Sequence, residues 1–141
     1  MRLLTPDASV ILKWVLPPEH EPGVQDAVAI LERFVAGEIE LVVPSLWYYE
    51  VGNTVARLVP DDAGEYLDQL RHLGMAEVGA AHAIELRALA IVRRFGVTFY
   101  DAVYHAVAAE LDGTLVTADR RYIARVGGDP TVVDLQRISQ A

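Results

Sequence analysis

The sequence contains no cysteine among its 141 residues. This absence excludes a disulfide framework, a zinc site built on thiolates and catalysis by a cysteine nucleophile. It also fits a protein of the reducing cytoplasm. We therefore look for chemistry among the oxygen and nitrogen side chains.

Long apolar runs are absent as well. No run approaches the roughly 20 residues that a membrane-spanning helix needs. The first residues, "MRLLTPDASVILKW", are basic and then apolar, but Asp7 and Lys13 interrupt them and no small-residue cleavage site follows. We expect neither a membrane span nor a signal peptide.

Basic residues are scarce. The chain has 12 Lys and Arg against 20 Asp and Glu, which gives a net charge of −8. An acidic protein repels nucleic acid unless cations or a local basic patch intervene. The overall charge therefore counts against a nucleic-acid partner. The rest of the composition is that of an ordinary globular protein, and the length indicates a single domain over residues 1–141.

Strand and helix patterns alternate along the chain, without an internal repeat, a low-complexity tract or a linker. This alternation indicates an α/β fold, a three-layer α/β/α sandwich around a mostly parallel central sheet. The predicted strands cover residues 2–6, 39–44, 75–78, 113–119 and 131–135. The predicted helices cover residues 9–16, 22–37, 46–58 (with Ser45 as N-cap), 61–74, 80–95, 98–110 and 120–126.

Four acids occupy unusual places in these patterns. Asp7 and Asp119 each follow an apolar strand, and ligands of open parallel sheets bind beyond the carboxyl ends of strands. Glu50 interrupts an apolar helix among aromatic residues, and Asp101 begins the helix "FYDAVYHAVAAE". Structural alternatives exist. Asp7 and Asp119 could cap the next helices, Thr98 and Asp101 are spaced like a capping box, and Glu50 could face solvent.

If the four acids converge, they need a cation between them, because carboxylates brought together repel one another. Oxygen ligands without His or Cys select a hard ion, Mg²⁺ or Mn²⁺. Such an ion can activate water and bind a phosphate oxygen, which is the chemistry of phosphodiester cleavage.

Four motifs follow one another in order: "DASVILKW" at Asp7, "PSLWYYEVGN" at Glu50, "FYDAVYHAVAAE" at Asp101 and "LVTADRRY" at Asp119. Together they resemble the PIN-domain ribonucleases, and most of all the VapC toxins of bacterial and archaeal toxin–antitoxin pairs. The resemblance implies metal-dependent cleavage of RNA. It also implies a VapB-like antitoxin whose tail fills the site, and a toxin homodimer.

The resemblance assigns roles by position. Asp7 and Asp101 match the acids that most directly hold the metal, and Glu50 and Asp119 complete the acidic quartet. The polar positions that support the acids are matched by Ser9, Asn53 and Thr117.

Basic residues close to the acids, Lys13, Arg120 and Arg121, are those we expect to contact RNA. Two positions depart from the family's pattern. Pro6 replaces a β-branched residue, and we expect the strand to end early there because proline lacks the N–H of a central strand. His105 stands where an apolar residue is usual, and it either touches the site or packs at the helix surface. The other three histidines form no metal-ligand spacing with it: His20, His72 and His82.

Three adjacent aromatic residues, Trp47, Tyr48 and Tyr49, compete for one small core, so we expect some of them at a two-fold interface. An alternative function is a catalytically inactive PIN-like module that binds RNA or protein, although all four acids are present. A haloacid-dehalogenase-like phosphatase would need Asp-x-Asp, and Ser9 stands at the second of these positions.

Overall fold

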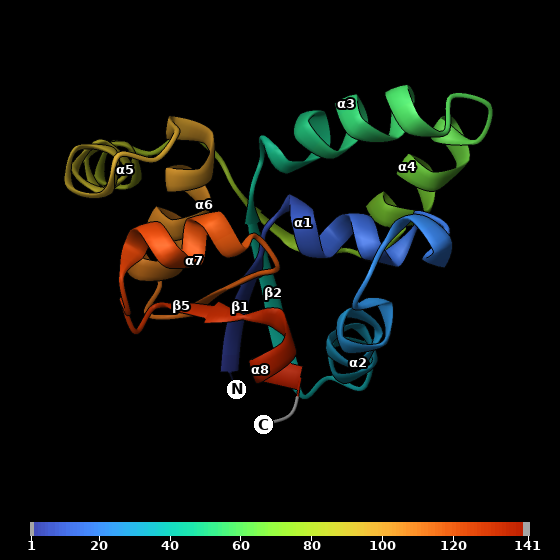
Figure 1. Cartoon of the computed structure of the whole chain (residues 1–141), viewed down its shortest axis with the longest axis horizontal. Helices are drawn as coiled ribbons and strands as arrows, with labels where there is room; N and C mark the ends of the chain where they lie inside the picture. The colour runs from blue at the N-terminus through green and yellow to red at the C-terminus, as the bar shows by residue number, and fades with distance from the viewer. Residues whose placement is uncertain (1, 140–141) are drawn as a thin grey trace.

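A computed structural model of the chain describes residues 2–139, apart from the side chains of His20 and Ser139. Five strands form one parallel sheet in the order β3-β2-β1-β4-β5 (Figure 1). The predicted α/β/α sandwich around a parallel sheet is therefore confirmed. The strands are β1 (Arg2–Pro6), β2 (Ile39–Pro44), β3 (Ala76–Val78), β4 (Thr114–Thr117) and β5 (Val132–Asp134).

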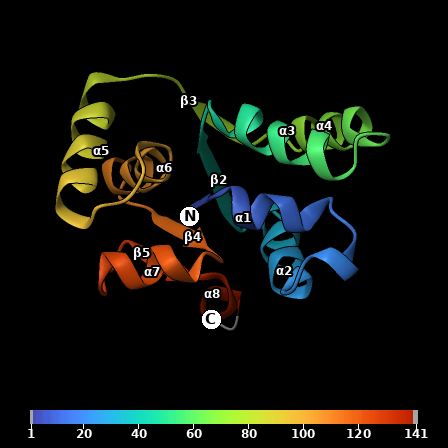
Figure 2. The same cartoon turned by 45° about the horizontal axis from the view of Figure 1, so that its top comes forward.

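Helices cover both sides of this sheet (Figures 1 and 2). On one side α6 (Phe99–Glu110) packs against β1, β2 and β4, and α5 (His82–Phe95) covers α6. The α7 helix (Arg120–Val126) follows β4 and contacts β5. The remaining helices are α1 (Ala8–Ile11), α2 (Val24–Val35), α3 (Trp47–Leu58), α4 (Ala63–His72) and α8 (Leu135–Ser139), with 3₁₀ turns at Leu12–Trp14 and Pro18–His20.

The α6 helix is the centre of the hydrophobic core on its side. Its buried residues lie around most of its circumference: Ala102, Tyr104, His105, Ala106, Val107 and Ala108. A helix that is apolar nearly all round is buried in a protein of this kind. The small alanine side chains let the sheet and α5 approach α6 from opposite sides. The N-terminus of α6, with Asp101, is thereby held at the edge of the sheet.

The expectation that the first strand ends early at Pro6 is wrong. β1 runs through Pro6, which pairs with Val116 of β4. The ladder bond at this point comes from the next residue, since the Asp7 N–H donates to the Val116 carbonyl oxygen at 3.1 Å. Proline is tolerated because its missing N–H is not the donor that the β1–β4 ladder uses.

Two other predictions need correction. Ser45 does not cap α3, because the N-cap is Leu46 without a side-chain hydrogen bond, and the Ser45 N–H donates to Val78 O at 2.9 Å. The last strand was expected through residue 135, but a short helix, α8, begins at Leu135. Asp134 Oδ1 accepts the Gln136 N–H at 2.9 Å, which stabilises the start of that helix.

Within the part of the chain that the structure describes, no helix is long and apolar enough to cross a membrane. The expected domain of residues 1–141 includes Met1, Gln140 and Ala141, which lie outside the described residues, and it stays a prediction.

Candidate active site

The pairing of β1 with β4 brings two acids from opposite ends of the chain to one edge of the sheet. Pro6 and Val116 are register partners, and Asp7 and Asp119 follow the ends of β1 and β4 by one and two positions. Both acids are half-buried. The carboxyl ends of parallel strands meet at the same edge, which is where the acids were expected to lie.

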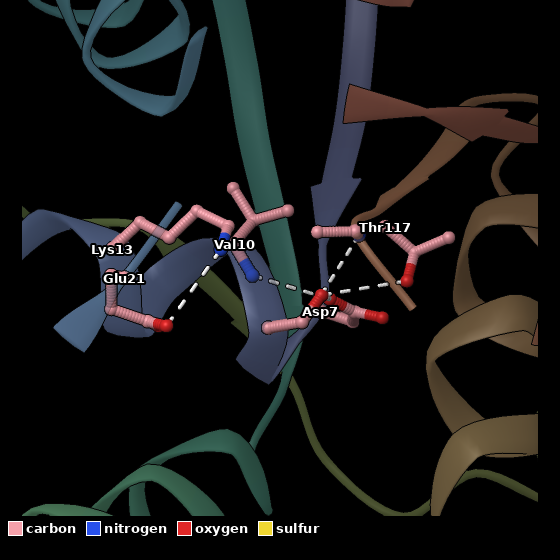
Figure 3. Close-up of polar contacts among 7 residues, drawn as sticks. Asp7, Val10, Lys13, Glu21 and Thr117 are labelled. Atoms are coloured by element: carbon pink, nitrogen blue, oxygen red, sulfur yellow. Dashed lines mark hydrogen bonds and ion pairs between the residues drawn. The ribbon is translucent and has the colours of Figure 1, made fainter. Parts of the chain in front are cut away.

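A small polar network holds Asp7. The Ser9 hydroxyl donates to Asp7 Oδ1, and the Val10 N–H reaches the same oxygen at 3.4 Å. Ser9 Oγ also accepts the Ala118 N–H at 2.9 Å and lies 3.5 Å from Thr117 Oγ1. Figure 3 shows Thr117 beside Asp7. Ser9 therefore joins the end of β1 to the end of β4, the supporting position that the sequence predicts.

Asp119 is the N-cap of α7. Its Oδ1 accepts the backbone N–H groups of Arg121 at 3.0 Å and Tyr122 at 3.2 Å. Its own N–H donates to Thr117 Oγ1 at 3.0 Å. The capping alternative is thus correct for Asp119, and also for Asp7, which is the N-cap of α1. Capping and a site role are compatible, because an N-cap carboxylate uses only part of its acceptor capacity.

The other two acids come from helices on the two sides of the sheet. Asp101 lies in the first turn of α6, and its N–H donates to Thr98 Oγ1 at 3.2 Å, so half of the predicted capping box is formed. Glu50 lies in the first turn of α3 and is half-buried, so it does not simply face solvent.

Electrostatics connect the four acids. Burial raises the pKa of Asp7 to about 6, with a further contribution from the charge of Asp101. Burial also raises the pKa of Glu50, as do the charges of Asp101 and Asp7. For Asp101, burial and the charge of Asp119 raise the pKa. Within residues 2–139 none of these four carboxylates forms an ion pair with a Lys or Arg, so their repulsion is uncompensated.

Tyr104 places a buried hydroxyl among these acids. Tyr104 is 1% exposed, and its hydroxyl has no hydrogen-bond partner in the described structure. It nevertheless lies close enough to Glu50 to lower the pKa of that carboxyl. Burial and the negative charge of Glu50 raise the pKa of Tyr104, so its hydroxyl keeps its proton and is available as a donor toward Glu50.

Two surface cavities are lined by three of the four acids, and Asp7 lines neither of them. Asp101 and Asp119 line a cavity of about 290 Å³ together with Arg121 and Tyr122. Glu50 and Asn53 line a second cavity, of about 400 Å³, with Tyr49 and Tyr100. Asn53 is exposed there, one turn after Glu50.

The three cations expected near RNA have different surroundings. Lys13 is only 7% exposed, and its Nζ lies 3.8 Å from Glu21 (Figure 3). Arg120 lies 3.5 Å from Asp134. Arg121 is exposed and lines the cavity of Asp101 and Asp119. Contact with RNA stays a prediction for all three, and Arg121 is the best placed.

His105 does not pack at the helix surface, because it is 1% exposed. It contacts the hydroxyl of Tyr122 at 2.6 Å and the carboxylate of Asp129 at 3.2 Å. Burial lowers the pKa of His105, so the imidazole is neutral at ordinary pH.

The donor chemistry of the edge fits a hard divalent cation. Its acids are oxygen donors that interact electrostatically, and Mg²⁺ and Mn²⁺ favour such ligands. Among residues 2–139, no three His, Asp or Glu side chains are gathered closely enough to hold an ion as they stand. The roles of Asp7, Glu50, Asp101 and Asp119 as metal ligands therefore stay predictions.

Sequence reasoning missed Tyr104, Tyr122 and Asp129. A regular spacing could have indicated the two tyrosines, because each follows an acid of the quartet by three positions on a helix, Tyr104 after Asp101 and Tyr122 after Asp119. Residues three apart lie on the same helix face. Asp129 lies in a turn after α7, and no sequence pattern connects it to His105.

The fold and the site together are those of an α/β protein whose acids lie beyond the carboxyl ends of parallel strands. The sequence model of the family described as PIN domain matches residues 4–129, and the chain belongs to this PIN-domain family, as its four motifs predict. It is similar to Ribonuclease VapC3 of Pyrobaculum aerophilum, with 33% identity over 125 residues that cover 84% of this chain and 90% of the relative.

Solved structures have the same fold. A toxin–antitoxin complex from Klebsiella pneumoniae contains a chain that matches with a TM-score of 0.68 and 17% identity, over 96% of this chain and 98% of that one. VapC20 of Mycobacterium tuberculosis, described as a sarcin-ricin loop cleaving toxin, matches with a TM-score of 0.66 and 13% identity, over 86% of this chain and 93% of that one.

Proposed function

We propose that this protein is a metal-dependent endoribonuclease and the toxin of a VapBC-like toxin–antitoxin pair. The observation that carries the proposal is the electrostatic interaction among Asp7, Glu50, Asp101 and Asp119, whose carboxylates no Lys or Arg neutralises within residues 2–139. Its similarity to a protein named as a ribonuclease supports the same activity. The absence of cysteine supports a cytoplasmic location.

The four acids would hold Mg²⁺ or Mn²⁺, which supplies an activated water and a contact for a phosphate oxygen. The chain's own residues orient these ligands. Ser9 and Thr117 fix the Asp7 carboxylate, and the first turn of α7 fixes Asp119. Since Glu50 and Asn53 line a neighbouring cavity, the acids would have to draw together around the ion.

Arg121 is the cation best placed to bind a phosphate of the RNA strand. It is exposed and shares a cavity with Asp101 and Asp119, whereas Arg120 and Lys13 already lie near acids. A local cation of this kind is needed because the net charge of −8 repels RNA elsewhere on the surface.

The experiment is cleavage of total RNA by the purified chain with Mg²⁺ or Mn²⁺, with and without EDTA, in parallel with Asp101→Asn. We expect cleavage that requires the metal and is lost in the variant. Activity that survives complete chelation would overturn the metal requirement. Binding of Mn²⁺ or RNA without cleavage would instead favour the inactive PIN-like module.

We call the edge of the sheet near Asp7, Glu50, Asp101 and Asp119 the acidic edge. We propose an antitoxin that delivers a cationic side chain to it. Burial and, to a smaller extent, repulsion between the acids raise the pKa of Asp7 and Glu50, and a cation there would relieve that repulsion. Association should be fast and should weaken with salt. Affinity for a purified VapB-like protein that depended neither on salt nor on Asp7 would contradict this partner.

We also propose a homodimer, but its interface cannot use all three aromatic residues that the sequence analysis names. Trp47 is buried, with its Nε1–H donated to Glu77 at 2.7 Å, and Tyr48 is half-buried beneath Arg71. Of the three aromatic residues only Tyr49 is largely exposed, at 80%. Other exposed apolar side chains include Val35, Leu86, Leu89, Phe99 and Tyr100. Light scattering at micromolar concentration should report a dimer, and a monomer would exclude it.

A further inference from the structure

Behind the acidic edge, a hydrogen-bond chain through the buried His105 links three side chains from different parts of the fold, of which Asp129 is half-buried. His105 of α6 is 1% exposed. Its Nδ1 lies 2.6 Å from the hydroxyl oxygen of Tyr122 on α7. Its Nε2 lies 3.2 Å from Oδ2 of Asp129, in the turn after α7. The ring of Phe95 stacks on the imidazole with a centroid distance of 6.3 Å. The imidazole is therefore held at both nitrogens and on one face.

The hydrogen bonds along this chain of three side chains are all donated in the same direction. The second Asp129 oxygen, Oδ1, accepts the Thr131 N–H at 2.9 Å, and an ionised carboxylate only accepts. Nε2 of His105 must then carry a proton, and a neutral ring leaves Nδ1 as an acceptor. Tyr122 presents a phenol hydroxyl, which is a hydrogen-bond donor at neutral pH. Tyr122 therefore donates to His105, and His105 donates to Asp129.

Two members of this chain, His105 and Tyr122, connect to the acids of the proposed site. His105 lies one helical turn after Asp101 on α6. The backbone N–H of Tyr122 donates to Asp119 Oδ1 at 3.2 Å, and Tyr122 lines the cavity that Asp101 and Asp119 share. The hydrogen bond between His105 and Tyr122 thus joins the helix of Asp101 to the first turn of the helix that Asp119 caps.

We propose that the Asp129–His105–Tyr122 chain is a positioning element, which sets the first turn of α7, and with it the Asp119 carboxylate, relative to Asp101. This inference rests on the proposed nuclease function, because it gives the three residues a role in arranging its ligands. None of the three need touch the substrate. A fully satisfied buried polar chain specifies one arrangement of its elements, whereas apolar packing at the same place tolerates several. Partners of this kind behind metal ligands affect affinity and activity.

The test compares Tyr122→Phe with Tyr66→Phe. Tyr122→Phe keeps the ring and removes the donor to His105. Tyr66→Phe removes a hydroxyl from α4, on the other side of the molecule (Figure 1), and is the matched control. We would measure Mn²⁺ affinity by calorimetry, kcat and KM for RNA cleavage, and hydrogen exchange of the amides of Arg121 and Tyr122 in the metal-free chain.

We expect Tyr122→Phe to lower Mn²⁺ affinity and kcat by about 10–100-fold, the usual effect of losing such a partner, with KM nearly unchanged. The amides of Arg121 and Tyr122, which donate to Asp119, should exchange faster while the core of α6 stays protected. The control should match the wild type in all three measurements. A Tyr122→Phe variant with a lower Tm but unchanged Mn²⁺ affinity and unchanged exchange at these amides would overturn the proposal and leave the chain as packing.

A double-mutant cycle shows whether the three residues act as one chain. Asp129→Asn removes the charge at the far end, and Tyr122→Phe removes the donor at the near end. If both act through His105, the double variant should lose no more Mn²⁺ affinity than the weaker-binding single variant, whereas independent effects would multiply and contradict the proposal. A wild-type chain that bound no Mn²⁺ would refute the proposed function instead, and the amide exchange of the metal-free variants would still decide the positioning role.

Discussion

The two acids at strand ends and the two acids on helices are held in different ways. Asp7 and Asp119 each accept backbone N–H groups from the helix that follows them. In the described structure, the carboxylates of Glu50 and Asp101 accept no backbone N–H of another residue. The hydroxyl of Tyr104 is the neighbour of Glu50, and that of Thr98 is the neighbour of Asp101. The strand-end acids are therefore ordered by the backbone itself, whereas the helix acids depend on their side-chain neighbours and on what binds between them.

The largest expected effect comes from Asp101→Asn, which removes a helix acid. Cleavage should fall by orders of magnitude, since a metal ion held by this acid would supply several kcal/mol of the barrier reduction. The metal-free variant should melt at the same or a higher temperature, because one of the repelling charges is gone. It should gain less stability from Mn²⁺. The measurements are paired melts with and without Mn²⁺ and an RNA cleavage assay.

If Asp101 acts only in the first turn of α6, its loss should cost about 0.3–1 kcal/mol and leave cleavage intact. A variant that is less stable without metal but still cuts RNA would reduce Asp101 to that role.

A strand-end acid should contribute to stability as well as to cleavage. Variants of Asp119 can separate these two contributions. Asn is as good an N-cap as Asp, whereas Ala lacks the acceptor and costs about 0.5–2 kcal/mol. Asp119→Ala should therefore be destabilised in chemical unfolding, and Asp119→Asn should stay close to the wild type. Both variants should lose cleavage. Equal stability of the two would mean that the hydrogen bonds to the first turn of α7 contribute little.

The pH dependence of stability offers a third comparison. The folded chain keeps a proton on Asp7 up to about pH 6, whereas the unfolded chain releases it near the usual value of 3.8. The folded state binds more protons in this window, so the contribution of Asp7 is present below about pH 4 and is lost as the pH rises through about 6. We expect the metal-free wild type to lose more stability over this range than Asp7→Asn does. Identical slopes would show that burial does not shift Asp7.

The smallest effect is expected for Tyr104→Phe. Its hydroxyl is buried without a partner, so its removal should change metal-free stability by less than about 1 kcal/mol. Since Tyr104 lowers the pKa of Glu50, that pKa should rise further in the variant, and NMR titration of Glu50 would measure it. If the pKa of Glu50 is the same in the variant as in the wild type, Tyr104 does not act on it.

The fold and the places of the four acids could be predicted because local patterns determine them. Apolar runs that stop at Asp7 and Asp119 define the ends of β1 and β4, and the carboxyl ends of parallel strands share one edge. The helix from 120 to 126 was predicted with its observed bounds. Ser45 was a wrong cap because its N–H donates to the carbonyl oxygen of Val78, far along the chain, just beyond the end of β2.

The surroundings of His105 could not be predicted in the same way. Its partners, Tyr122 and Asp129, come 17 and 24 positions later, from α7 and from the turn that follows it. Only the packing of α6 against α7 brings them together. A periodicity of 3.6 residues indicates which face of a helix is buried. It does not indicate which polar group of the neighbouring element contacts that face. Lys13 is a similar case, since its burial beside Glu21 depends on how the chain folds back after η1 (Leu12–Trp14).

The pairing of the first strand with the fourth also determines when the site can exist during synthesis. β1 leaves the ribosome well before its partner β4, because Ser9 and Thr117 are separated by 108 positions. A nascent chain that has reached α4 carries Asp7 and Glu50 but neither Asp101 nor the hydroxyl of Thr117. Contacts between such distant residues form late and slowly. Until β4 has been made, the growing polypeptide therefore cannot assemble the acidic edge, and the proposed nuclease activity could begin only after that strand has been synthesised.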